Sequence, residues 1–244
     1  MKEKIYTITL NEAFEADSEC PFCFLHKELE KENVEYALGA AMMEPDFRIL
    51  SNERGFCRQH YSMMFEKQNK LSLSLLLETH LYEFTGKFKD LSSELKRCEK
   101  RSFIKKSDAI SNFDKMLSEK EVSCVICEKT EATMKRYEEV FFYLWKNEEL
   151  FREKVKKSKG VCIPHFRTLF LSAFKYLPKN EAKDFVSFLY EKEISALDRL
   201  QDEIHRFTLK FDYRNKDMEI GSAIDAPLRT IEKIAGYMHQ NKQE

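Results

Sequence analysis

Hydrophobic and polar residues follow one another along most of the chain with the three-to-four-residue period of an amphipathic helix. Residues 24–43, 128–146 and 163–177 are clear examples, and we expect a helix over each of them. Residues that form hairpin turns are scarce, because only six glycines and five prolines occur among 244 residues, 34% of which are charged. The pattern therefore predicts an all-α fold.

No apolar stretch is long enough to cross a bilayer. The most hydrophobic ones, residues 71–77 and 140–145, fall far short of the ~20 residues that a transmembrane helix needs. In residues 1–17, charged or polar side chains interrupt every apolar run before a signal-peptide core could form. We therefore expect a cytoplasmic protein that does not bind membranes.

The charges are almost balanced, with 41 basic and 42 acidic side chains and a net charge of -1. Such a chain has no overall field that would attract nucleic acid or anionic lipid. The basic run at 96–106 carries six positive residues but a single aromatic, so we expect a solvated face or a connection there. A protein partner of unknown identity agrees better with this composition than nucleic acid does.

Six of the seven cysteines stand in short elements that match one another. In chain order these elements are Cys20–Cys23, Cys57–His60, Cys124–Cys127 and Cys162–His165, each with two residues between its members. A reducing cytoplasm disfavours disulfides, so this spacing indicates metal binding. The seventh cysteine, Cys98, has no such neighbour, and we expect a free thiol there.

The cysteine elements belong to an internal repeat. A glycine stands two positions before each third cysteine, an aromatic residue follows each histidine, and Leu-Tyr-Glu recurs at 81–83 and 189–191. We infer two related helical units, residues 1–107 and 108–210. Residues 211–244 match nothing in the repeat and are expected to form a C-terminal loop and helix docked on the core.

Each unit contains the donors of one metal site, three thiolates and one imidazole, which form a complete tetrahedral set for zinc. The first predicted site is Cys20, Cys23, Cys57 and His60, and the second is Cys124, Cys127, Cys162 and His165. Pro21 and Pro164 suit first helical turns, so two helix starts should meet at each metal and favour the thiolate form. Two zinc ions per chain are expected, with an iron–sulfur cluster as the less favoured alternative.

The other histidines are weaker candidates for metal ligands. His26 follows Cys23 by three residues and competes with His60 for the first site, but the repeat has Thr130 in the equivalent place. Three more have no cysteine or histidine partner nearby, and we expect packing or surface roles for them: His80, His205 and His239.

The C-terminal region should end in a helix. Asp225 is suited to the N-cap, Pro227 to the first turn, and Gly236 to the end. The preceding loop contains Phe-Asp-Tyr-Arg at 211–214, which either lines a site through Asp212, Tyr213 and Arg214 or docks on the core through Phe211 and Tyr213.

These motifs together resemble a known family. The paired Cys-x-x-Cys elements, the paired Gly-x-Cys-x-x-His elements and a closing FDYRN…DAPLR are similar to a bacterial domain family of unknown function. Its members are sometimes labelled ABC-transporter substrate-binding proteins. The resemblance covers most of the chain and implies no established reaction, and the transporter label agrees poorly with the N-terminal sequence.

Motifs of catalytic sites are missing from the sequence, including phosphate-binding loops, dinucleotide-binding fingerprints, the nucleophile elbow and His-Glu-x-x-His. Four protein ligands also leave no open position on the metal. The sequence therefore favours a non-catalytic binding or scaffold protein. A redox-responsive zinc–thiolate switch is the alternative, and an enzyme that uses a cleft near Arg214 and Asp225 is weaker.

Overall fold

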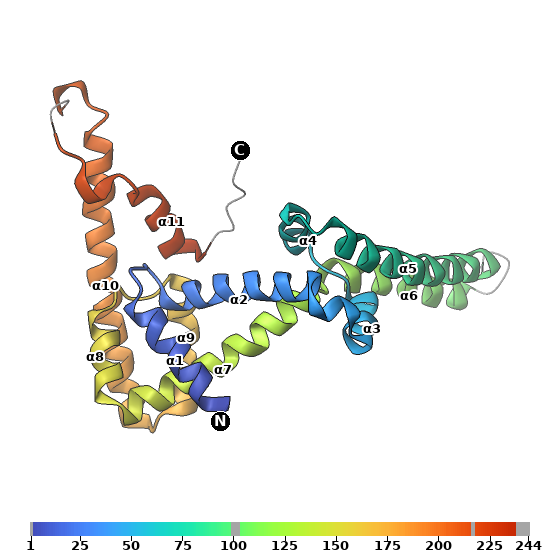
Figure 1. Ribbon diagram of the computed structural model, residues 1–244, viewed down its shortest axis with the longest axis horizontal. Helices are drawn as coiled ribbons and strands as arrows, with labels where there is room; N and C mark the ends of the chain where they lie inside the picture. Colours follow the sequence, from blue (N-terminus) through green and yellow to red (C-terminus); the bar gives the residue numbers. More distant parts are fainter. Residues whose placement is uncertain (1, 99–102, 216–217, 238–244) are drawn as a thin grey trace. The chain divides into compact units, whose positions relative to one another are not determined.

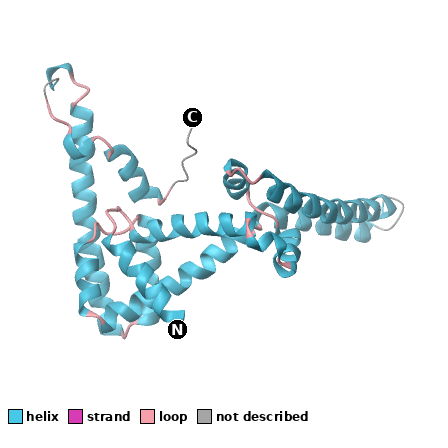
Figure 2. Ribbon diagram, viewed as in Figure 1, coloured by secondary structure: helices cyan, strands magenta, loops and turns pink. Residues whose placement is uncertain are grey.

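The computed structural model describes residues 2–98, 103–215 and 218–237 (Figure 1). All regular structure in these residues is helical and none of it is strand, as Figure 2 shows. The predicted all-α fold is confirmed. None of the described helices is sufficiently long and apolar to span a membrane.

Eleven α-helices and three short 3₁₀-helices form the described part of the chain. In chain order they are α1 (Lys2–Glu15), α2 (Pro21–Leu38), η1 (Ala40–Met43), α3 (Pro45–Arg54), α4 (Arg58–Glu66), α5 (Lys70–Cys98), α6 (Phe103–Val122), α7 (Val125–Asn147), α8 (Glu149–Lys157), α9 (Ile163–Tyr176), α10 (Lys179–Leu209), η2 (Tyr213–Asn215), η3 (Gly221–Ala223) and α11 (Ala226–Ala235).

The helices expected from the hydrophobic pattern are present as α2, α7 and α9. Helix α2 ends earlier than expected, at Leu38, because Gly39 follows and the chain continues as η1. The C-terminal helix is α11, with Asp225 at the N-cap position and Gly236 at its end, where φ is 87°. The Asp225 carboxylate makes no capping bond and pairs with Arg229 instead.

The helices form two compact units that interleave along the sequence. One unit contains residues 1–28 and 133–244, and the other contains residues 29–132. The divisions fall inside α2 and α7, so each of these helices begins in one unit and ends in the other. These units do not follow the repeat boundaries at 107 and 210, which remain a prediction about the duplicated sequence.

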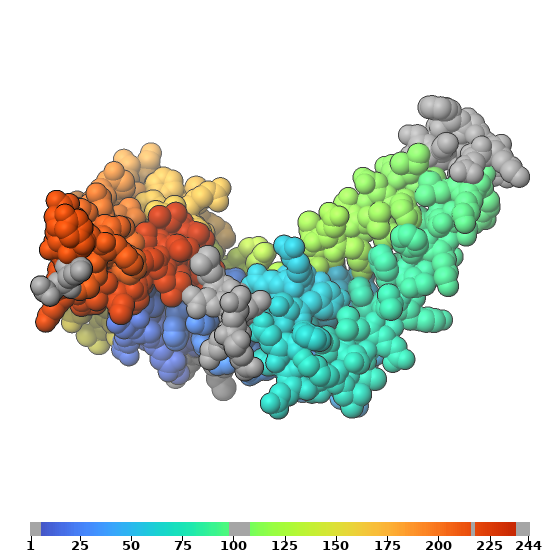
Figure 3. Space-filling view, turned by 90° about the horizontal axis from the view of Figure 1, so that it is seen from above, coloured from blue at the N-terminus to red at the C-terminus, as the bar shows by residue number. Residues whose placement is uncertain are grey.

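The unit of residues 1–28 and 133–244 has a core of aromatic rings. Phe141 on α7 lies at its centre, with ring centroids 5.7 Å from Phe14, 5.6 Å from Phe22 and 5.6 Å from Phe151. Helix α11 packs against α9 and α10 in this unit (Figure 1). In the space-filling view of Figure 3, the red residues of α11 lie beside the blue residues near the N-terminus, as the Arg229–Glu19 ion pair requires.

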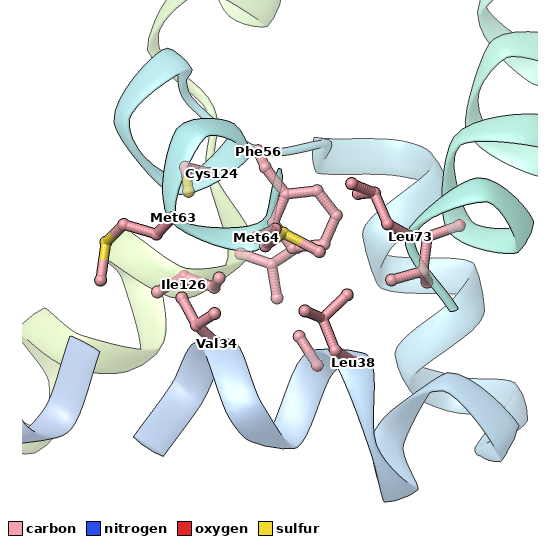
Figure 4. Packing of buried hydrophobic residues seen from close by; sticks show 11 residues of the cluster. Val34, Leu38, Phe56, Met63, Met64, Leu73, Cys124 and Ile126 are labelled. Atoms are coloured by element: carbon pink, nitrogen blue, oxygen red, sulfur yellow. The ribbon is translucent and has the colours of Figure 1, made fainter. Parts of the chain in front are cut away.

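The unit of residues 29–132 has a smaller core, shown in Figure 4. Val34 and Leu38 on α2 pack there against Met63 and Met64 on α4. Cys124 belongs to the same buried cluster. The core therefore places the start of α4 and the start of α7 beside each other.

Replacing Phe141 by Ala should lower the free energy of unfolding by about 3–5 kcal/mol, because it removes a fully buried ring from the centre of the aromatic core. Thermal or urea unfolding followed by circular dichroism measures the effect. Tyr143→Ala is the matched control, since Tyr143 lies on the same helix and is exposed. Equal losses in the two variants would contradict the assignment of Phe141 to the core.

Candidate metal sites

The structure gathers the eight predicted ligand residues into two groups of four. Cluster A consists of Cys20, Cys23, Cys162 and His165, and cluster B consists of Cys57, His60, Cys124 and Cys127. In each cluster the potential ligand atoms all lie within 4.8 Å of one another. Cluster A lies entirely in the unit of residues 1–28 and 133–244, and cluster B in the unit of residues 29–132.

The pairing predicted from the repeat is wrong. Each Cys-x-x-Cys element was expected to join the next Cys-x-x-His element along the chain, whereas the structure joins the first to the fourth element and the second to the third. The reason is the direction of α2. His60, at the start of α4, lies against Glu30, which is seven residues or about 10 Å further along α2 than Cys23. The element Cys57–His60 therefore cannot share one ion with Cys20 and Cys23.

In cluster A the ring nitrogen Nδ1 of His165 faces the three sulfurs. It lies 3.0 Å from Cys162 Sγ, 3.4 Å from Cys23 Sγ and 3.5 Å from Cys20 Sγ. The sulfurs of Cys23 and Cys162 are 3.4 Å apart. A tetrahedral zinc with ordinary bond lengths separates S from N by about 3.5 Å and S from S by about 3.8 Å. The donor atoms therefore fit one ion of this size.

Cluster B has the same arrangement. His60 Nδ1 lies 3.2 Å from Cys57 Sγ, 3.2 Å from Cys124 Sγ and 3.4 Å from Cys127 Sγ. The sulfurs of Cys57 and Cys127 are 3.8 Å apart. The likeness of the two clusters shows that both offer the same Cys3His donor set through the same histidine nitrogen.

Two helix starts meet at each cluster, as predicted. Cys162 is the N-cap of α9 and Cys57 is the N-cap of α4, while α2 and α7 each begin directly after a cysteine. The backbone N–H of Cys23 donates to Cys20 Sγ at 3.4 Å, and that of Cys127 donates to Cys124 Sγ at 3.5 Å. Free N–H groups and the helix dipoles favour thiolates at these positions.

The comparison with known protein families agrees with the motifs. The family described as "Family of unknown function (DUF6062)" matches residues 1–241. The chain belongs to this family. No curated protein and no solved structure matches it. The family description names no activity, so the chemistry must be argued from the two clusters.

The sulfurs of the DUF6062 chain cannot all ionise easily without a cation. Hydrogen bonds from Cys127 and His60 lower the pKa of Cys124 to about 3, and those from Cys20 and Cys23 lower the pKa of Cys162 to about 4. The pKa values of the neighbouring thiols shift in the opposite direction. Hydrogen bonding to Cys162 raises the pKa of Cys23, and hydrogen bonding to Cys124 raises that of Cys127. A divalent cation would offset this repulsion.

Glu30 orients the histidine of cluster B. Its carboxylate oxygen lies 3.3 Å from His60 Nε2, and the two side chains are only 5% and 1% exposed. Burial by itself lowers the pKa of His60, but its contacts with Cys124 and Glu30 raise it to about 10. With a metal on Nδ1, the remaining Nε2–H would donate to Glu30, a pairing that fixes the ring in many metal sites.

The surroundings of cluster A are different. The His165 ring stacks on Phe22, with centroids 5.6 Å apart. Lys233 on α11 is completely buried beside the two loops that carry the cysteines, and it pairs with Glu193. Neither Lys233 nor Glu30 was predicted, because a lysine or a glutamate on a charged helix has no distinguishing spacing. The repeat did mark Gly160, whose φ of 86° and close approach to Glu193 require glycine.

The other predicted candidates lie outside the clusters. His26 is near the Tyr237 ring, His80 Nδ1 contacts the Asn52 carbonyl oxygen at 2.9 Å, and His205 is exposed. His239 and the side chain of Cys98 lie outside the described residues, as does part of the basic run at 96–106.

The C-terminal loop at 211–214 does not dock as expected. Phe211 and Tyr213 are both exposed, so the expectation that they hold the tail on the core is wrong. Arg214 pairs with Asp212 at the surface. A pocket of ≈ 590 Å³ does lie beside α11, and Asp225 lines it, but Arg214 does not.

The exchanged pairing predicts which cysteines lose protection together. In protein loaded with zinc, Cys162→Ser should expose Cys20 and Cys23 to alkylation while Cys124 and Cys127 stay protected, because the variant removes a ligand from cluster A alone. Peptide mass spectrometry after treatment with N-ethylmaleimide measures this. Cys57→Ser is the matched variant and should expose Cys124 and Cys127 only. Exposure of Cys124 and Cys127 by Cys162→Ser would support the sequential pairing instead.

Proposed function

We propose that this chain is a helical binding or scaffold protein in which clusters A and B each hold one structural zinc ion. The observation that supports this most is the convergence of three sulfurs and one Nδ1 nitrogen within 4.8 Å in both clusters. This donor set suits zinc and fills all four tetrahedral positions. A metal without an open position has a structural role, so the zinc would hold two helix starts together in each unit.

Zinc fits the clusters better than an iron–sulfur cluster. The sulfur–sulfur distances of 3.4 Å and 3.8 Å are those of ligands around a single ion. A cluster of several irons and sulfides would need its cysteine ligands further apart. A reducing cytoplasm would keep these cysteines as thiols, the form that can bind zinc.

Exposed apolar side chains support a role in binding another protein. On α5, the neighbouring side chains of Leu81 and Tyr82 are exposed. Large apolar side chains gathered on a surface are typical of contact sites for protein partners. A scaffold held rigid by metal would present this surface in a fixed shape.

Protein purified without added metal should contain two zinc ions per chain, because both clusters offer complete donor sets. Elemental analysis and native mass spectrometry measure the content. Removal of the zinc by a chelator at neutral pH should lower the melting temperature, since the thiolates then repel one another. Chains that carry no metal, or iron with sulfide, would contradict the proposal.

A redox-responsive switch is the second candidate. The sulfurs of Cys23 and Cys162 lie 3.4 Å apart, so two-electron oxidation by a peroxide could join them as a disulfide with release of the zinc. In that step the peroxide O–O bond breaks, an S–S bond forms, and two protons convert the peroxide oxygens to water or alcohol. Peroxide treatment that releases zinc in proportion to disulfide formed would favour this candidate. Retention of zinc with an intact fold would exclude it.

An enzyme remains the weaker candidate. The pocket beside α11 contains carboxylates and arginines, but they pair with one another: Arg229 with Glu203 at 2.5 Å and Arg199 with Glu19 at 2.5 Å. Groups held in such pairs are poorly placed to act as acid and base. Loss of a measured activity on Glu203→Gln, with the zinc content unchanged, would be needed to favour catalysis in this pocket.

A further inference from the structure

Lys233 connects the two loops that carry the cysteines of cluster A. Its side chain is 0% exposed, and Nζ donates hydrogen bonds to the backbone carbonyls of Glu19 at 2.9 Å, Lys159 at 2.9 Å and Val161 at 3.2 Å. Glu19 directly precedes Cys20, and Val161 directly precedes Cys162. One ammonium group therefore joins two segments that are far apart in the sequence, at the residues next to the ligands.

Buried carboxylates make this position specific for a cation. Glu193, which is 4% exposed, lies 3.3 Å from Lys233 Nζ and also accepts the Val161 N–H at 3.0 Å. The Glu19 carboxylate lies 3.8 Å from Nζ and is held in place by Arg199 and Arg229. A buried ammonium is stable only when it is paired and its hydrogens are bonded, and here three carbonyls and two carboxylates meet that need.

The end of α11 covers the sulfurs directly. The backbone N–H of Tyr237 donates to Cys23 Sγ at 3.3 Å. A Cβ atom added at Gly236 would lie 3.8 Å from Cys162 Sγ. The φ angle of Gly236 is 87°, a value that glycine adopts readily. Helix α11 and its last turn therefore contact both halves of cluster A.

Cluster B is held by its own neighbours in the chain. Lys120 and Ser123, just before Cys124, donate to the carbonyls of Glu53 and Arg54, and the Val125 N–H donates to the Gly55 carbonyl at 3.1 Å. These contacts join the two ligand-bearing segments directly. In cluster A the two ligand-bearing segments are joined directly by the Lys159–Asp17 ion pair and, in addition, through α11, which supplies no ligand.

We infer that α11 is a strap for cluster A, so that docking of α11 and metal binding at cluster A stabilise each other. This inference rests on the proposed function, because it requires a metal at cluster A. If metal binding at cluster A favours the docked state of α11, docking must favour metal binding by the same free energy. Helix α11 also supplies Leu228, Arg229 and Glu232 to the wall of the ≈ 590 Å³ pocket, so metal at cluster A would favour the docked state in which this wall is complete.

Lys233→Met tests the strap in the full chain loaded with two zinc ions. Met keeps the length of the side chain but donates no hydrogen bonds. Zinc affinity at cluster A should fall about 10–100-fold, the loss typical of a removed partner around a metal ligand. Zinc loss to a chelator should be correspondingly faster at cluster A and unchanged at cluster B. Time-resolved alkylation identifies the cluster, because cluster A releases Cys20, Cys23 and Cys162.

Lys156→Met is the matched control, since Lys156 pairs with Glu153 at the surface of the same unit and should leave both rates unchanged. Equal rates of zinc loss from cluster A in Lys233→Met and in the wild type would overturn the inference. Absence of zinc from the wild-type protein would overturn the proposed function first, so the two failures are distinguishable.

The effect of metal at cluster A on the docking of α11 is measured without changing Lys233. Hydrogen exchange of residues 226–237 should become faster in Cys162→Ser, which disrupts cluster A, and should not change in Cys57→Ser, which disrupts cluster B. This comparison also decides the case in which Lys233→Met fails to fold. Unchanged protection of α11 in Cys162→Ser, with Cys20 and Cys23 free to react, would show that the helix docks independently of the metal.

Discussion

The close approach of three sulfurs and one imidazole is the constraint that shapes each cluster. Two helix starts bring these groups within 4.8 Å of one another, and the free N–H groups there favour thiolates. Several thiolates at this distance are stable only with a cation among them. The helix starts, the histidine orientation and the surrounding hydrogen bonds are consistent with that requirement in both clusters.

The exchanged pairing changes how the metal would stabilise the chain. Cluster A joins residues 139 positions apart, and cluster B lies inside the loop so formed. This loop is about four times longer than the loop in the sequential pairing. Closing the longer loop costs only about 1 kcal/mol more in chain entropy. The direction of two long helices outweighs that difference, because α2 and α7 begin in one unit and end in the other.

The two clusters share ligands but differ in what surrounds them. Cluster B has Glu30 on its histidine and is closed by adjacent residues of the chain. Cluster A has a stacked Phe22 on its histidine and a buried lysine between its loops. The repeated ligand set therefore has two different supports, one that includes Glu30 of α2 and one supplied by the C-terminal helix.

The sequence alone determined the fold class, the main helices and the eight residues that the two clusters contain, because helical periodicity and ligand spacing are local properties of the chain. It could not determine the pairing, since Cys20 and Cys23 form a Cys3His set equally well with Cys57 and His60 or with Cys162 and His165. Only the tertiary structure decided this, because the choice depends on where α2 and α7 end. The same holds for Lys233 and Glu30, whose importance arises from burial against distant residues and not from any neighbour in the sequence.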